Sequence, residues 1–415
     1  MKNFKKLMIV FFALTCFLVV SIEMPRSVLA AEGEGTSRPA QNERPIKVGI
    51  PHNEKFPFAE MMKNSFEMAL TVINGKGGIN GRPLKLVYAN DQGKPDVGEK
   101  IIKKLIKEEN VAMLVGGYSS RNTVYMAGMA EKLDRPFLIT TAADDRITQR
   151  KWKNVYRINP PASGYTQGLE NFFLQKVQPK SMAIVYENSP YGTGGALRMM
   201  WFCREQGIEI TKIIPYHRER IKEEYYKRIL NPLKDEPPDV IYMVSYLKDA
   251  VALVKVIRKM DIPSLLCGGA GGFTHPKFIT DAGEDGDRVL TVTLWFQEIS
   301  YSGIEEYYND YLKLAGTDPD YHGAEAYSAL LVAADALRRA ESLSPGNIRA
   351  ALDKTDITTP FGPVRFLSYE KFERQNSLPT QVLQVVNGQF HCVWPEKLAT
   401  SEFAPPAYWR ASERR

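Results

Sequence analysis

Short apolar segments rich in β-branched residues alternate with segments of helical periodicity along the first part of the chain. Met62, Phe66 and Ile73 recur at helical spacing, whereas 111–117 is a continuous apolar run, typical of a strand buried on both faces. The predicted strands are 46–51, 85–90, 111–117 and 136–141, and the predicted helices are 59–73, 95–109 and 120–133. This alternation is typical of parallel α/β units.

The same alternation begins again after residue 160. It predicts helices at 164–177, 191–206, 222–233 and 247–260, and strands at 181–187, 208–215, 239–245 and 264–269. After Val289 the chain offers one strand, 288–295, two long helices and the apolar segments 359–366 and 380–395. These pieces are too few for a third domain, so we expect them to complete sheets already begun.

The predicted fold class is α/β, with two doubly wound parallel-sheet lobes joined by a multi-strand hinge and a ligand cleft between the lobes. We expect lobe 1 to comprise 46–160 and 294–375, lobe 2 to comprise 161–293 and 376–400, and 401–415 to form a C-terminal tail. A chain that leaves lobe 1 and later returns to it must cross the hinge several times.

The N-terminus has the features of an export signal. Lys2, Lys5 and Lys6 precede the apolar run 7–20, which is shorter than the roughly 20 residues needed to span a bilayer, and small residues follow near Ala30. We therefore predict a cleaved signal peptide over 1–30, a flexible leader over 31–45, and a periplasmic or otherwise extracytoplasmic protein. An uncleaved N-terminal anchor is the alternative.

Charge and cysteine content narrow the function further. The whole chain has a formal net charge of +6, but residues 1–30 hold four of the 54 Lys and Arg and one of the 48 Asp and Glu, so the mature chain carries only +3. This small excess gives no support to nucleic-acid binding. Cys203, Cys267 and Cys392 remain after cleavage, and the sequence leaves open whether two of them form a disulfide or all are buried free thiols.

Motifs for catalysis, cofactors and metals are missing from the sequence. "YGTGGALR" resembles a dinucleotide-binding loop, but Leu197 occupies the position of the third small residue. A phosphate-binding loop and a nucleophile elbow are both absent, and the five histidines have no zinc-type spacing. We therefore expect a protein that is not an enzyme and that has no cofactor and no metal; an exported hydrolase is the alternative.

Polar residues follow the predicted strands where ligands of open α/β sheets bind. Ser119 and Ser120 follow the strand at 111–117 and can offer hydroxyl and N–H groups to a carboxylate; helix capping is the alternative role. After the next strand, Thr141, Ala142 and Asp144 can offer a hydroxyl, a free carbonyl and a carboxylate to a cationic group, with capping again the alternative for Asp144.

Two tyrosines are placed similarly in the second half. Tyr191 begins the helix after strand 181–187, and Tyr246 follows strand 239–245. Both can close over a ligand held by the first lobe, and core packing is the alternative for Tyr191. The glycine-rich loop 267–273 lies at the corresponding later strand end, where its glycines can also be simple turn residues.

Several motifs occur in an order that points to a known family. "GGINGRPLKLVYAND", "GGYSS", "ITTAADD", "YENSPYGTGG", "TPFGPVRF" and "VVNGQFHCVWPEKLA" together resemble type I periplasmic binding proteins of the leucine/isoleucine/valine-binding class, and the resemblance covers nearly all of 45–405. It implies a two-lobe monomer that binds an amino acid, an amide or a similar small polar ligand and delivers it to an ABC permease in the membrane.

The resemblance also implies roles for individual residues. By position, Ser120 and Ala142 hold the ligand's carboxylate and ammonium groups, and Phe58, Tyr191 and Tyr246 are the aromatic residues around it. The chain departs from the family at two positions: Ala270 stands where the second lobe's acidic residue is expected, and Asp144 stands where threonine is usual. A carboxylate at Asp144 can take over the ammonium contact. The identity of the ligand stays open, as does an alternative role as a ligand-binding sensory protein that acts with a separate membrane receptor.

Overall fold

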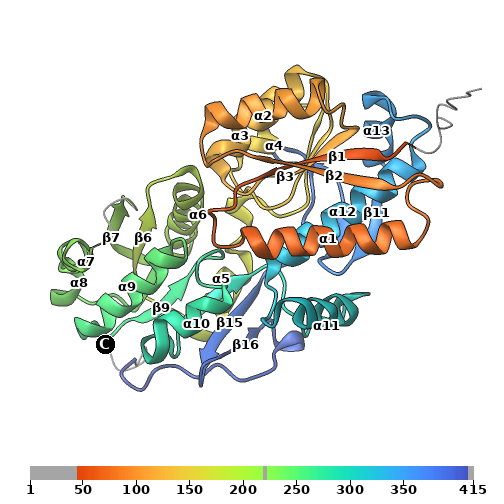
Figure 1. Cartoon of the computed structure of the whole chain (residues 1–415). Coiled ribbons are helices and arrows are strands. Elements are labelled where there is room, and N and C mark those ends of the chain that lie inside the picture. The colour runs from red at the N-terminus through yellow and green to blue at the C-terminus, as the bar shows by residue number, and fades with distance from the viewer. Residues whose placement is uncertain (1–43, 218–221, 410–415) are drawn as a thin grey trace, which may run out of the picture. The chain divides into compact units, whose positions relative to one another are not determined.

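Two seven-stranded sheets organise the chain in the computed structural model, which describes residues 44–217 and 222–409 (Figure 1). The predicted signal peptide, most of the predicted leader and the last six residues of the predicted tail lie outside the described residues. Within the described ranges, no helix is long and apolar enough to cross a membrane.

The first sheet is the centre of lobe 1. Its strands, in spatial order, are β13 (Leu367–Tyr369), β14 (Phe372–Gln375), β5 (Val155–Arg157), β4 (Phe137–Ile139), β3 (Met113–Gly116), β1 (Ile46–His52) and β2 (Leu84–Asn90). All neighbours are parallel except β13 and β14. β3 is apolar and buried throughout, as expected of a parallel strand covered on both faces.

Helices cover both faces of this sheet. α1 (Ala59–Gly75) and α12 (Tyr321–Arg339) pack together on one face, and α2 (Pro95–Lys107) and α3 (Ser120–Lys132) pack together on the other (Figure 1). α2 buries Ile102, Leu105 and Ile106 and turns its lysines to solvent, as its periodicity predicts. The remaining helices of this lobe are α4 (Arg146–Gln149), α11 (Ile304–Ala315) and α13 (Pro345–Leu352).

The second sheet is the centre of lobe 2. Its spatial order is β16 (Gln389–Trp394), β15 (Gln381–Val386), β10 (Leu290–Thr293), β9 (Leu265–Gly268), β8 (Val240–Val244), β6 (Ser181–Glu187) and β7 (Glu209–Tyr216). The strands from β10 to β7 are parallel, whereas β15 and β16 add an antiparallel hairpin at the β10 edge.

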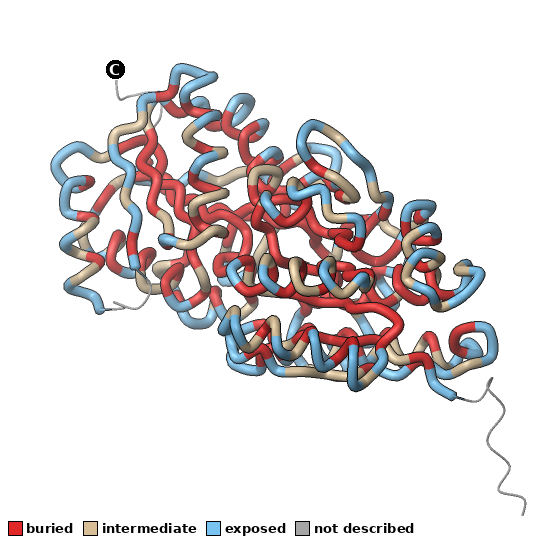
Figure 2. The backbone as a smooth tube through the Cα atoms, turned by 90° about the horizontal axis from the view of Figure 1, so that it is seen from above, coloured by how far each residue is buried: buried red, intermediate tan, exposed pale blue. Residues whose placement is uncertain are grey.

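Lobe 2 has its own set of helices around a sheet whose strands β8, β9 and β10 are buried throughout. In Figure 2 the buried backbone, in red, lies mainly inside the molecule and the exposed backbone, in blue, on its outside. The helices of this lobe are α5 (Gln167–Phe172), which continues into a π-helical turn, Phe173–Val177, then α6 (Pro190–Gln206), α7 (Glu223–Leu230), α8 (Pro232–Asp235), α9 (Leu247–Lys259) and α10 (Pro276–Ala282). Short 3₁₀ turns lie at Ala162–Gly164, Gly283–Gly286 and Glu396–Leu398.

The sheet order confirms the predicted fold class of two mainly parallel α/β lobes. The chain passes between the sheets three times, in the connections β5 to β6, β10 to β13 and β14 to β15. The residue limits given above for the lobes stay a prediction.

One late segment differs from its prediction. The stretch 359–366 does not complete a sheet, because it belongs to an isolated hairpin of β11 (Asp356–Thr359) and β12 (Gly362–Arg365). Pro360 and Pro363 lack the N–H groups that a strand inside a large sheet must donate. The edge of the first sheet is formed instead by β13 and β14, which were not predicted. The segment 380–395 does join the second sheet, as β15 and β16, and this prediction is confirmed.

Candidate ligand site between the sheets

A small cavity of about 20 Å³ lies where the carboxyl ends of strands from both sheets meet. Tyr118 and Ser120 follow β3, and Thr141 and Ala143 follow β4. Lobe 2 contributes residues that follow β6, β8 and β9, and the start of α12 closes the remaining side. The full lining is Tyr118, Ser120, Thr141, Ala143, Tyr165, Tyr191, Tyr246, Gly271, Tyr321 and His322.

Aromatic rings dominate this cavity. The ring centroids of Tyr191 and Tyr246 are 5.3 Å apart, and those of Tyr118 and Tyr246 are 6.4 Å apart. Behind them, the His322 ring lies between Phe58, at 3.6 Å, and Tyr321, at 4.0 Å, and stacks on both. A flat or apolar ligand body therefore has ring faces on several sides, and the tyrosine hydroxyls add polar groups at the ring edges.

Ser120 is the first residue of α3 and its side chain is buried. Its Oγ accepts hydrogen bonds from the backbone N–H groups of Ala143 and Asp144, both at 3.1 Å. Because both contacts use the oxygen as an acceptor, the hydroxyl hydrogen is left to donate. The serine thus joins the strand ends of β3 and β4 and presents a donor at the cavity.

Thr141 links the cavity to a buried acid. Its hydroxyl lies 2.7 Å from Oε2 of Glu325, on α12, and Glu325 is fully buried. The other oxygen of that carboxyl has no hydrogen-bond partner among the described residues. Burial raises the pKa of Glu325 well above its ordinary value, and Asp320 adds to this increase while the bond from Thr141 opposes it.

A fully buried arginine fixes the loop after β4. Arg157 donates to the carbonyl oxygens of Ala142 and Asp144, at 3.1 and 2.8 Å, and also to Thr148 and Gln375. Desolvation lowers the pKa of the Arg157 guanidinium, and its four acceptors offset the cost of burying it. The carbonyl of Ala142 therefore already accepts one hydrogen bond, and a ligand contact through its second lone pair stays a prediction.

Asp144 does not line the small cavity. Its buried carboxylate makes a bidentate pair with Arg146, with contacts of 2.6 to 3.1 Å, and also accepts the Arg146 backbone N–H. The Asp144 carboxylate is therefore already paired, and the N-cap position of α4 belongs to Asp145, so a ligand contact of Asp144 stays a prediction.

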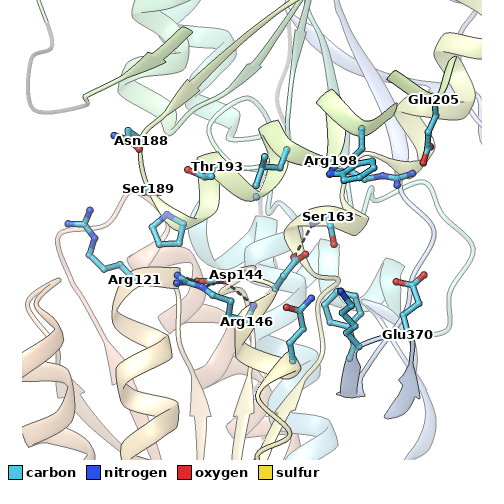
Figure 3. Close-up of a pocket in the computed structure, with 18 residues that line it drawn as sticks. Arg121, Asp144, Arg146, Ser163, Asn188, Ser189, Thr193, Arg198, Glu205 and Glu370 are labelled. Carbon is cyan, nitrogen blue, oxygen red and sulfur yellow. Dashed lines mark hydrogen bonds and ion pairs between the residues drawn. The ribbon is translucent and has the colours of Figure 1, made fainter. Parts of the chain in front are cut away.

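The Asp144 side chain lies instead in an outer groove of about 1150 Å³, between the loop after β4 and helix α6. Figure 3 shows Arg121, Asp144 and Arg146 on one side of this groove and Asn188, Ser189 and Thr193 on the other. The groove is larger than the inner cavity, but its open walls carry charges of both signs and its ionic groups are partly paired with each other.

The other sequence-predicted residues are divided between the cavity and its surroundings. Tyr191 and Tyr246 line the cavity, as does Ser120, whereas Ser119 precedes α3 and its side chain makes no capping bond. Phe58 lies behind the lining, where it stacks on His322. Ala270 is also buried behind it, and its carbonyl accepts the hydroxyl of Tyr191.

The next residue, Gly271, has a φ of +103° and lies against Tyr191, so that a Cβ there would be 2.6 Å from the tyrosine hydroxyl. Only glycine satisfies both constraints. The glycine-rich loop is therefore part of the site as well as a turn.

Sequence reasoning missed four aromatic members of the lining, and Glu325 beside them. Tyr118 stands within the "GGYSS" segment that was singled out, and Tyr165 follows the first crossing between the sheets. Tyr321 and His322 begin α12, a helix that buries Glu325 among alanines and leucines. The one acid within 324–334, a stretch otherwise of alanine, leucine, valine, serine and tyrosine, was the available signal for this side of the site.

Contacts between the lobes lie beside the cavity. His275, which follows β9, packs its ring on Phe58 with centroids 4.6 Å apart, and its Nε2 lies 3.4 Å from the Pro57 carbonyl oxygen. Its Nδ1 accepts the backbone N–H of Lys277. This contact requires an unprotonated Nδ1, and burial lowers the pKa of His275 in agreement with it.

The three cysteines of the described chain are buried and free, so the structure answers the question that the sequence left open. In residues 44–217 and 222–409 there is no group of three or more His, Cys, Asp or Glu side chains placed to hold a metal ion.

Fold and cavity together define a two-lobe α/β protein with a candidate ligand site between its sheets. The chain belongs to the periplasmic binding protein family, whose sequence model matches residues 45–389. Leu/Ile/Val-binding protein homolog 7 of Brucella melitensis is 26% identical over 383 residues, which cover 87% of this chain and 94% of the relative.

Two solved structures share the fold. The branched-chain amino acid transporter substrate-binding protein LivJ of Streptococcus pneumoniae, in complex with isoleucine, has a TM-score of 0.75 at 20% identity and covers 84% of this chain and 98% of its own. An ABC transporter solute-binding protein of R. palustris, in complex with benzoate, has a TM-score of 0.75 at 18% identity and covers 84% and 95%.

Proposed function

We propose that this protein is the extracytoplasmic solute-binding component of an ABC importer. It binds an amino acid, an amide or a similar small polar ligand between its lobes and delivers the ligand to a membrane permease, without making or breaking a covalent bond. The observation that carries this proposal is a single cavity lined by residues from both lobes, with Ser120 and Thr141 on one side and Tyr191 and Tyr246 on the other.

Ligand-driven closure follows from that lining. A cavity of about 20 Å³ has room for about one water molecule, so a ligand enters only when the lobes separate or the tyrosines rotate. Separation breaks the contact of His275 with Pro57 and Phe58. A ligand that touches both lobes stabilises the closed state by its differential affinity for that state.

The lining restricts the chemistry of the ligand. Neither lysine nor arginine is among the lining residues in the described part of the chain, so a ligand carboxylate is held by hydrogen bonds, with Ser120 as a donor. The tyrosine rings suit a flat or apolar body. The solved structures with isoleucine and benzoate show that this fold accommodates both an aliphatic amino acid and an aromatic acid in other proteins.

We assign direct ligand contacts to Ser120, Tyr191 and Tyr246. Four other predicted residues position the lining residues and do not touch the ligand in this proposal, because each is packed or hydrogen-bonded behind the lining: Phe58, Ala142, Ala270 and Asp144. A ligand contact of Ser119, at the residue before α3, also stays a prediction.

A melting panel tests the proposal. The full mature protein is unfolded, dialysed and refolded to remove bound ligand, and its melting temperature is recorded with amino acids, amides, small acids and aromatic carboxylates. A ligand at 100 times its Kd adds about 2.7 kcal/mol, so one chemical class should raise the midpoint.

Two tyrosine variants complete the test. Tyr246→Ala should abolish the ligand-induced shift, whereas Tyr125→Ala, at an exposed tyrosine of α3 outside the cavity, should keep it. No shift with any class, or the same loss in both variants, would count against this site.

A further inference from the structure

Glu325 is a buried acid that the fold does not explain. It lies on α12, whose other buried residues are mostly small or apolar, and one of its two carboxyl oxygens has no partner among the described residues. Burial of a carboxyl without full hydrogen bonding is costly, so its presence calls for a compensating interaction. The other oxygen accepts a hydrogen bond from the Thr141 hydroxyl, across the interface between α12 and the end of β4.

The helix places this acid toward the cavity. Glu325 follows Tyr321 by four residues and therefore lies on the same face of α12, one turn further along. Tyr321 lines the cavity, and so does Thr141, the residue whose hydroxyl reaches Glu325. The carboxyl thus lies directly behind the cavity wall, with Thr141 between it and the ligand space.

The charge on Glu325 sets the role of the Thr141 hydroxyl. When the acid is ionised, the hydroxyl must donate to it, and only the oxygen lone pairs of Thr141 are left to face the cavity as acceptors. Ser120 has the opposite polarity, because its oxygen already accepts two backbone N–H groups and its hydrogen is left to donate. The cavity therefore offers a donor at Ser120 and, once a cationic ligand group stabilises the ionised form of Glu325, an acceptor backed by a negative charge at Thr141.

We propose that Glu325 and Thr141 determine specificity by holding the positively charged amino group of the ligand, while Ser120 meets its carboxylate. This inference rests on the proposed function and narrows it to α-amino acids, in preference to simple acids. The acid comes from α12, at neither of the two positions that the sequence suggested: Ala270 has no charge, and Asp144 is already paired with Arg146.

Matched probes separate this inference from the proposed function. L-Leucine is compared with 4-methylpentanoate, and L-phenylalanine with 3-phenylpropanoate, by titration calorimetry of the refolded full mature protein at pH 7. Within each pair the body and the carboxylate are the same, and only the amino group differs. Wild type should bind the amino acid of at least one pair at least about 30-fold more tightly than the amine-free acid, as expected when a buried charge would otherwise lose its partner.

Variants then locate the source of that preference. Glu325→Gln should remove most of the preference for the amino acid over the amine-free acid. Asp335→Asn should leave this preference intact; it is a loss of a carboxylate on the same helix, at a residue whose ion pair with Arg339 lies at the surface. Thr141→Ser should retain the preference and Thr141→Val should reduce it, because only serine keeps the hydroxyl. A purely structural role of Glu325 would lower the affinity for both members of a pair equally.

Three results would overturn the inference. If an amine-free acid binds wild type as tightly as its amino acid, the site does not select the amino group, although the proposed function stands. If Glu325→Gln keeps the full preference, another residue provides it. If neither amino acid binds while another ligand class stabilises the protein, the assignment to α-amino acids is wrong and only the general carrier function survives.

Discussion

Replacing Ser120 by alanine should destabilise the ligand-free protein, and the adjacent Ser119 provides a control with the same chemical change. The Ser120 hydroxyl is buried and accepts two backbone N–H groups, from Ala143 and Asp144, each at 3.1 Å. Removing an acceptor leaves each buried donor unsatisfied at a cost of about 1 to 3 kcal/mol. Both bonds are near the long end of the usual range, so we take the lower value for each and expect a loss of about 2 kcal/mol.

Ser119→Ala should cost no more than about 0.5 kcal/mol, because the Ser119 side chain makes no capping bond and is not fully buried. The assay is urea-induced unfolding of both refolded, ligand-free variants under identical conditions, followed by far-UV circular dichroism. Equal losses of stability in the two variants would refute the reasoning that Ser120 joins the ends of β3 and β4. The same pair should separate in ligand titrations, since only Ser120 lines the cavity.

Three further predictions concern buried ionisable groups. Arg157→Met should cost about 3 kcal/mol or more in urea unfolding, because it leaves the acceptors of a fully buried guanidinium unpaired; a loss below about 1 kcal/mol would contradict this. Burial lowers the pKa of His275, so the folded protein binds fewer protons than the unfolded chain and loses stability as the pH falls through about 6.5. The His275→Asn variant can still accept the Lys277 N–H, and its melting temperature should decrease less than that of wild type between pH 7.5 and 5.5. Burial raises the pKa of Glu325, so ligand-free wild type should lose stability as the pH rises above about 4.5, by at most about 1.4 kcal/mol per pH unit. The Glu325→Gln variant should lack this loss in thermal melts between pH 5 and 8. Melting temperatures of the two proteins that change in parallel with pH would contradict the prediction.

Much of the fold was predictable because strand burial leaves a direct trace in the sequence. Apolar runs such as 111–117 and 240–244 are typical of strands buried on both faces, and they form interior strands of the two sheets. The short edge strands β13 and β14 carry no such trace, since their residues are mixed and largely exposed or half-buried. Their place is set by pairing with β5 across more than 200 residues of chain, which local patterns do not encode.

The site was predictable only where it follows from topology. Strand ends in parallel sheets meet at one edge, and this rule placed Ser120, Tyr191 and Tyr246 together. Hydrogen bonds decided the rest: Arg157 donates to the carbonyl of Ala142 and to Gln375, far along the chain, and Arg146 pairs with the carboxylate of Asp144, two residues before it. The contacts of Arg157 depend on three-dimensional packing and cannot be read from neighbouring residues, whereas the pair of Asp144 with Arg146 is local and was overlooked.

A ligand-bound crystal structure of the refolded full mature protein is the most direct test of the central claim that ligand binds between the lobes. The compound that gives the largest rise in melting temperature would be used. We expect electron density for the ligand between Ser120 and Tyr246, in a cavity enlarged from the present volume of about 20 Å³ and in contact with both lobes. Density confined to the outer groove, beside Asp144 and Thr193, would contradict it.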